Sequence, residues 1–224
     1  MSIRYIDVEQ GTEEWIEARR GILTASEMHK IITPTLKLAN NDKTRAHVYE
    51  IAAQRITGYV DPSYCGDDML RGVEDEIEAR LAYSKHYAPV DDAGFIVRDF
   101  GKFTIGYSPD GLVGDDGLIE CKSRRQCFQV QTISGEKMPE DYLLQVQTGL
   151  LVSGRSWCDF ISYSGGMPMA VFRVFHDDDV QSAIIDAALS FEQRVSDVIS
   201  GYRDVVARRK FINTERRVEQ EMII

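Results

Sequence analysis

Two carboxylates and one ammonium group are predicted to meet within the stretch Tyr107–Lys122, YSPDGLVGDDGLIECK. Its Asp-Asp-Gly run has turn chemistry and precedes a short apolar strand, so the stretch is expected to form a β-hairpin. Because side chains alternate along a strand, Glu120 and Lys122 point to one side while Cys121 points away. In the simplest hairpin register, Asp110 lies at the mouth of that same side. The spacing therefore predicts a cluster of Asp110, Glu120 and Lys122.

Such a cluster is suited to binding a divalent cation beside a phosphate. Asp110 and Glu120 offer hard oxygen ligands for Mg²⁺, or for Mn²⁺, and the main-chain carbonyl of Cys121 is a further oxygen ligand. Lys122 would orient an attacking water or offset charge that grows on the phosphorus oxygens. A surface hairpin with an acidic turn is the ordinary alternative. An unpaired Glu inside an apolar strand is costly, which favours the functional interpretation of Glu120.

The composition favours one soluble domain over residues 1–224, with 43% hydrophobic and 28% charged residues. A net charge of −10 argues against a protein that coats DNA, but it allows a local basic groove. The four cysteines form no C-x-x-C pair, so no zinc or iron–sulfur site is expected. No apolar run approaches the roughly 20 residues that span a bilayer, and the N-terminus lacks a signal-peptide pattern. A cytoplasmic protein without a membrane partner is expected.

The N-terminal region is predicted to be a helical elaboration that creates an anion site. A helix should begin near Thr12, which can cap it, and end before Gly21. The capping-box spacing of T-A-S-E opens a second helix over residues 24–32. Arg19 and Ser26 would then face one small space, where a guanidinium and a helix N-terminus can hold an anion. Alternatively, Arg19 is a surface residue and Ser26 only helps the cap.

The other elements indicate an α/β fold with a central mixed β-sheet of about five strands, flanked by helices. A helix over 69–86 is expected to turn Ile77 and Leu81 inward. Arg124 and Arg125 either meet a phosphate backbone or form a solvated basic turn, and no helix or strand is assigned to residues 123–135. The remaining expected helices are 44–57, one from Pro139 and a long C-terminal one from 177, and the expected strands are 93–99, 102–107, 157–163 and 169–175.

Several motifs together resemble the phage lambda exonuclease family, the YqaJ-type viral recombinases. S-P-D at 108–110 with E-C-K at 120–122 resembles the PD-(D/E)xK nuclease signature. The segment EQGTEEWIEARRGILTASEMHKII is similar to the N-terminal motif of the family. Gly72, Glu76 and Ala79-Arg80 match its G-x-x-x-E-x-x-A-R helix, and Y-L-L-Q-V-Q matches its Y-x-x-Q-x-Q segment. Residues 123–138 show little similarity.

The resemblance implies roles for residues outside the hairpin. Glu76 would complete the metal site formed by Asp110, Glu120 and the Cys121 carbonyl. The terminal 5′-phosphate of DNA would be held by Arg19 and Ser26, with Ser108 as a further contact.

Three more residues are placed at the DNA end. Gln145 and Tyr142 would lie near the metals. Met69, which precedes the motif helix, is either a wedge that splits terminal base pairs or a buried core residue.

The resemblance also implies the activity. It predicts a restriction-endonuclease-like core and a metal-dependent 5′-to-3′ exonuclease that acts on double-stranded DNA ends. Such an enzyme releases mononucleotides and leaves 3′ single strands for recombination. It further implies a toroidal homotrimer, a single-strand annealing protein as partner, and a phage or prophage gene expressed in a bacterial host. Two alternatives remain open: an endonuclease on the same core, and a non-catalytic DNA-end-binding module.

Overall fold

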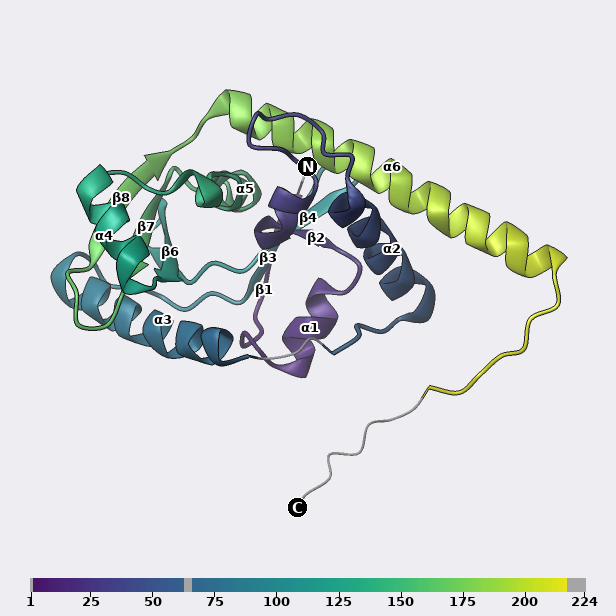
Figure 1. Cartoon of the computed structure of the whole chain (residues 1–224), viewed down its shortest axis with the longest axis horizontal. Helices are drawn as coiled ribbons and strands as arrows, with labels where there is room; N and C mark the ends of the chain where they lie inside the picture. Colours follow the sequence, from purple (N-terminus) through teal and green to yellow (C-terminus); the bar gives the residue numbers. More distant parts are fainter. Residues whose placement is uncertain (1, 63–65, 217–224) are drawn as a thin grey trace, which may run out of the picture.

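The chain forms two four-stranded mixed sheets flanked by helices, which confirms the expected α/β class (Figure 1). The computed structural model describes residues 2–62 and 66–216. The first sheet has the order β1 (Ser2–Ile6), β3 (Phe95–Asp99), β4 (Thr104–Tyr107), β2 (Leu23–Thr24). The second has the order β5 (Gly111–Val113), β6 (Gly117–Ser123), β7 (Trp157–Tyr163), β8 (Ala170–Phe175). The pairs β2–β4 and β6–β7 are parallel and the other pairs are antiparallel.

Helices cover both faces of the second sheet. α5 lies against strands of both sheets and against α6, α3 covers the opposite face of β6 and β7, and α2 packs along α6. The α-helices are α1 (Glu13–Arg19), α2 (Asp42–Thr57), α3 (Asp67–His86), α4 (Gln126–Gly135), α5 (Leu143–Ser153) and α6 (Asp178–Arg208). Two 3₁₀ helices are η1 (Ala25–Lys30) and η2 (Glu140–Tyr142). The structure contains no helix, among the residues it describes, that is long and apolar enough to cross a membrane.

The expectation of one central sheet of about five strands is wrong, because the chain changes sheets at residues 108–110. β4, in the first sheet, ends at Tyr107, and β5, in the second sheet, begins at Gly111. Pro109 has no N–H group to continue a strand ladder, so the break falls where the signature motif lies. The motif residues thereby sit between the two sheets.

α1 begins where the sequence predicts it, but the helix predicted to follow it is shorter than expected and is of the 3₁₀ type. Thr12 caps α1 and accepts a hydrogen bond from the Trp15 N–H. The helix expected over 24–32 is the shorter η1. The Thr24 hydroxyl donates to Glu27 Oε2 at 2.8 Å instead of capping the backbone.

The predicted inward face of α3 is the wrong one. Ile77 and Leu81 are 55% and 61% exposed. The helix instead buries Ala79 and Tyr83 against β5, β6 and β7. Its large aliphatic residues therefore lie on the solvent side, while smaller and polar residues face the sheet.

Two elements lacked a sequence signal. β1 is an edge strand with mostly exposed side chains, paired with β3. α4 buries a polar face: Gln129 Nε2 donates to the carbonyls of Ser162 and Pro168 at 3.0 and 2.8 Å.

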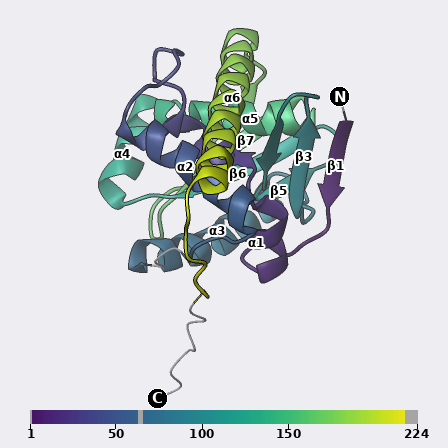
Figure 2. The same cartoon turned by 90° about the vertical axis from the view of Figure 1, so that its right-hand side faces the viewer.

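The long α6 is buried mainly along its first half, and Val198 and Ile199 beyond it are partly buried against the core. Its buried side chains end at Val195, and its last turns project beyond the two sheets (Figures 1 and 2). Asp177 caps its start by accepting a hydrogen bond from the Val180 N–H at 3.1 Å.

Candidate active site

Glu120, on the central strand β6, is the most enclosed carboxylate of the motif. Its side chain is 1% exposed and accepts three hydrogen bonds. Oε1 accepts from Lys122 Nζ at 2.6 Å and from the Gln145 amide, and Oε2 accepts from the Tyr107 hydroxyl at 2.8 Å. These donors hold the carboxylate in one orientation, which is what a metal ligand requires.

Asp110 is held at the start of the hairpin by backbone contacts. Its Oδ2 accepts a hydrogen bond from the Cys121 N–H at 2.5 Å, so Oδ1 is the oxygen that a cation would take. The preceding Pro109 carbonyl accepts from the Gln10 side chain at 2.8 Å, which ties the N-terminal segment to the motif. The Cys121 thiol is buried on the opposite face, toward α3.

Lys122 remains an ammonium in this setting. Burial acts to lower its pKa, but the charges of Glu120 and Asp110 outweigh burial, and the pKa of Lys122 is raised above the usual value. A lysine in this state donates hydrogen bonds and offsets negative charge; it does not take up a proton.

The site carries more negative than positive charge. Burial, followed by the charge of Glu120, raises the pKa of Asp110 well above its ordinary value, and Glu76 adds to the effect. Burial also raises the pKa of Glu76 on α3, and Glu120 raises it further, although Arg80 and Lys122 oppose this. Asp110, Glu120 and Glu76 thus all interact electrostatically with Lys122, and Glu76 also interacts with Arg80. The donor set fits a divalent cation, because such an ion would relieve the repulsion between the carboxylates.

A glycine on α5 makes room for the tyrosine that positions Glu120. A Cβ atom at Gly149 would lie 2.7 Å from the ring of Tyr107. Burial raises the pKa of Tyr107 well above its ordinary value, so its hydroxyl keeps the proton that it donates to Glu120. This role of Tyr107 does not follow from the sequence motifs, although its β-strand position just before the motif is a usable signal.

A second cluster adjoins the first through the residues that precede Asp110. Ser108 Oγ accepts hydrogen bonds from Trp15 Nε1 at 2.8 Å and from Arg19 at 3.3 Å. The Arg19 guanidinium also stacks on the Trp15 ring, 4.1 Å from its centroid. Burial lowers the pKa of Arg19, partly offset by Glu27, but an arginine stays charged. Trp15 belongs to the N-terminal motif of the family, but the sequence predicts no role for it, although its spacing of four residues from Arg19 places both on one helix face.

Ser26 lies near this cluster but opens onto its own small cavity. Arg19 directs its hydrogen bond to Ser108, whereas the exposed Ser26 lines a cavity of about 260 Å³ together with Tyr142 and Gln145. The structure therefore brings Ser26 to the same side as Gln145, which contacts Glu120.

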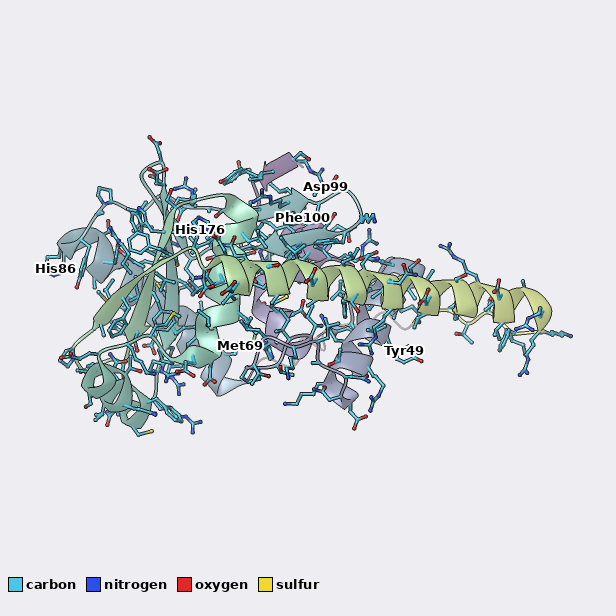
Figure 3. All side chains as sticks on the ribbon, turned by 90° about the horizontal axis from the view of Figure 1, so that it is seen from above. Tyr49, Met69, His86, Asp99, Phe100 and His176 are labelled. Atoms are coloured by element: carbon cyan, nitrogen blue, oxygen red, sulfur yellow. The ribbon has the colours of Figure 1, made fainter. Side chains whose placement is uncertain are left out.

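Met69 stands at the start of α3 with its side chain 55% exposed (Figure 3). Its exposure argues against the core alternative.

Within residues 2–62 and 66–216, the three carboxylate or imidazole side chains whose ligand atoms already lie within 4.8 Å of one another belong to Glu27, His47 and Glu50. Lys30 already lies among them, with Nζ 3.2 Å from Glu27 and 3.7 Å from Glu50. Burial acts to raise the pKa of Glu27, but His47 and Lys30 lower it by more. Both candidate groups thus include an ammonium: Lys30 lies beside Glu27 and Glu50, and Lys122 lies 2.6 Å from Glu120 among the motif carboxylates.

Comparison with known proteins agrees with this geometry. Residues 14–156, more than half of the chain, match the YqaJ-like viral recombinase domain. The chain is similar to the crystal structure of an alkaline exonuclease, LHK-Exo, from Laribacter hongkongensis, with 31% identity, a TM-score of 0.78, and coverage of 88% of this chain and 99% of that one. LHK-Exo in complex with dAMP matches with 32% identity, a TM-score of 0.77 and the same coverage.

A phage-related exonuclease from Haemophilus somnus 129PT shares the fold, with 15% identity, a TM-score of 0.59, and coverage of 81% of this chain and 96% of that one. Comparison with curated proteins gave no match. The chain belongs to the YqaJ-like viral recombinase family, a family of lambda exonuclease-like nucleases, and its activity is that of a DNA exonuclease.

Proposed function

We propose that this chain is a metal-dependent 5′-to-3′ exonuclease that degrades the 5′ strand from double-stranded DNA ends and leaves 3′ single strands. The whole chain acts as one nuclease domain, with α1 and η1 as an N-terminal elaboration and α6 as a C-terminal extension. The complex of LHK-Exo with dAMP supports mononucleotides as products, since dAMP is a deoxyribonucleoside monophosphate.

One relationship carries this proposal: an anion site lies two residues from a candidate metal ligand. Ser108 and Arg19 form the anion site, and Asp110 follows after the rigid Pro109. A terminal 5′-phosphate held by Arg19, Ser108 and Ser26 would set a fixed distance to the bond that is cut. This arrangement favours an exonuclease over an endonuclease, which has no use for an end anchor.

The residues of the motif then bind the metal ion and orient the reacting groups. Asp110, Glu120 and the Cys121 carbonyl, assisted by Glu76, would hold Mg²⁺, with Mn²⁺ as the alternative ion. When bound, the cation supplies positive charge that polarises the phosphate. Lys122 donates hydrogen bonds to the attacking water or to the phosphate oxygens, because it keeps its proton.

Gln145 and Tyr142 position the DNA end beside Glu120, and Met69 separates its terminal base pair. Gln145 suits its role because its amide also contacts Glu120. The exposed thioether of Met69 gives an apolar tip that can stack against a base.

We also propose that three copies form a ring around DNA. An exposed apolar stripe runs along one side of α3, formed by Leu70, Val73, Ile77 and Leu81. An apolar groove of about 750 Å³ lies between α2 and α6, lined by residues that include Tyr49, Ile56, Tyr202 and Val205 (Figure 3 labels Tyr49). α3 and this groove lie on different sides of the molecule (Figure 1). A contact between two different surfaces is head-to-tail, the kind that closes into rings.

The family match to viral recombinases supports a role in recombination. In this role the enzyme is phage- or prophage-encoded, works in the cytoplasm of a bacterial host, and delivers its 3′ single strands to a single-strand annealing protein.

The deciding experiment is digestion of linear duplex DNA labelled at either end, with Mg²⁺ or with a chelator. The expected result is release of labelled mononucleotide from the 5′ label only, dependent on Mg²⁺, and no attack on a covalently closed circle. Cleavage of the circle would establish the endonuclease instead. No product at any metal concentration would leave only a DNA-end-binding module.

A further inference from the structure

A cavity of about 600 Å³ lies beside the candidate active site, between α4 and η2. Its lining includes Arg124 and Phe128 on one side and Lys137, Glu140 and Asp141 on the other. Asp141 also lines the cavity that holds Ser26, Tyr142 and Gln145, so the two cavities are neighbours. The cavity therefore adjoins the one lined by Gln145, whose amide contacts Glu120.

Arg124 links this cavity to the residues of the motif. Its guanidinium lies 5.2 Å from the Phe128 ring centroid and 5.4 Å from that of Tyr142. Its Nη1 donates to the Tyr142 hydroxyl at 2.8 Å. Lys122 Nζ lies over the Tyr142 ring, 5.7 Å from its centroid. Two aromatic rings and two cations are thus arranged in sequence from the metal ligands to the cavity.

Arg124 also has an unused donor. Its Nε is enclosed and lacks a hydrogen-bond partner within residues 2–62 and 66–216. An enclosed donor without a partner costs free energy, and the Nε atoms of Arg98 and Arg155 are in the same state.

Phe128 presents an aromatic surface at the cavity. Its side chain is 47% exposed, although α4 buries polar residues such as Gln129 and Thr132 on its other side. An aromatic ring beside an arginine is the arrangement on which unpaired bases stack in proteins that bind single strands.

The charge of the lining favours a base over a string of phosphates. Lys137 pairs with Glu140 at 3.0 Å, and Asp141 lies on the same side of the cavity. Two basic and two acidic side chains therefore nearly cancel, while the carboxylates can accept hydrogen bonds from the amino groups of a base.

We propose that this cavity binds an unpaired nucleotide, with its base stacked on Phe128 and its polar edge on Arg124. The inference rests on the proposed exonuclease function and adds a subsite to it. The nucleotide comes either from a single strand of the substrate or from the mononucleotide that is released.

The test is binding of a short fluorescent single-stranded oligonucleotide to the full chain with chelator, measured by anisotropy over a range of salt concentrations. Phe128→Ala should weaken binding about tenfold, the size expected for one stacked base. Phe128→Tyr should restore it to within about twofold, because the ring is kept. The slope of affinity against salt should not change in Phe128→Ala, because no phosphate contact is lost.

Val130→Ala is the matched control, since Val130 is an exposed apolar residue on α4 that does not line the cavity. Equal binding by wild type and Phe128→Ala, or an equal loss in Val130→Ala, would overturn the proposal. A change of oligomeric mass in Phe128→Ala, measured by light scattering, would also overturn it and identify a subunit contact instead.

Competition by dAMP distinguishes the two sources of the nucleotide. If dAMP displaces the oligonucleotide from wild type and does so more weakly from Phe128→Ala, the cavity takes released nucleotide. If only oligonucleotide binding depends on Phe128, the cavity takes the strand. Digestion of linear duplex by wild type, run in parallel, shows separately whether the exonuclease function itself holds.

Discussion

The hydroxyl of Tyr107 lies 2.8 Å from Glu120 Oε2, and both groups are fully enclosed between β6 and α5. The contact fixes the orientation of a carboxylate that is almost fully buried. Glu120 therefore depends on a residue from the other sheet for its orientation. The proposed metal binding at β6 would in this way depend on the packing of β4.

Tyr107→Phe should raise the Mg²⁺ concentration needed for half-maximal activity by about tenfold, because residues that orient a metal ligand contribute 10–100-fold to metal affinity. The measurement is duplex digestion over a Mg²⁺ titration. The matched control is Tyr83→Phe, which removes a similar hydroxyl, 2.6 Å from Asp159 on the α3 side of the second sheet. It should lower stability but leave the Mg²⁺ dependence unchanged. The same shift in both variants would contradict a specific role for Tyr107.

The hairpin and its cluster could be predicted because a strand has a period of two, so Glu120 and Lys122 must share a face. The capped start of α1 was equally local. α4 could not be predicted, since its buried contacts are made by polar groups such as Gln129. The spacing of apolar residues therefore gives no indication of a helix there.

Apolar periodicity also predicted the wrong buried face for α3. Its stripe of Val73, Ile77 and Leu81 is regular, so it was assigned to the core, yet these side chains are exposed. The face toward the sheet carries Ala79, Tyr83 and Glu76, whose small or polar side chains serve packing and the site. A regular pattern of large apolar residues indicates a helix face that is suited to packing. The pattern does not show whether that face packs against the core of the same chain or against another molecule.

Arg19→Ala should reduce digestion of 5′-phosphorylated ends by about 10–100-fold, the value of a charge-assisted hydrogen bond, and affect 5′-hydroxyl ends much less. The measurement compares initial rates on the two kinds of end. Arg20→Ala is the neighbouring control, because Arg20 pairs with Glu17 on the surface. An equal loss on both ends in Arg19→Ala would remove the end-anchor role.

Asp110→Asn should stabilise the metal-free protein at about pH 8 while abolishing cleavage. The folded-state pKa of Asp110 is raised by burial and by Glu120, so ionisation destabilises the fold as pH rises from about 4, the unfolded value, through the folded value. The gain in melting temperature over wild type should therefore shrink as pH falls toward about 4.

Melting curves with chelator and with Mg²⁺ test this effect. Mg²⁺ should raise the melting temperature of wild type and leave Asp110→Asn nearly unchanged. Asp115→Asn, an exposed position in the turn of the same hairpin, is the control and should behave as wild type. A wild-type protein that Mg²⁺ does not stabilise would count against a metal at Asp110.

Lys122→Ala should slow cleavage by about 10²- to 10³-fold, the range for removing one group that stabilises transition-state charge. Binding of DNA ends should be retained within about threefold, since the substitution leaves the proposed anion site around Arg19 unchanged. Single-turnover rates and end-binding anisotropy separate the two effects. Lys102→Ala, at an exposed turn position, is the control. Unchanged turnover in Lys122→Ala would remove Lys122 from the mechanism.

The double substitution Ile77→Ser and Leu81→Ser should reduce the mass in solution from three chains to one, because the α3 stripe would no longer bury against a second copy. Both side chains are exposed, so the melting temperature of the single chain should hardly change. Glu74→Ser with Glu78→Ser, exposed on the same helix, is the matched control.

Tyr202→Ser in the groove between α2 and α6 should reduce the mass as well, since a head-to-tail contact needs both surfaces. Light scattering gives the masses, and a wild-type monomer, or a loss caused by only one of the two surfaces, would contradict the ring.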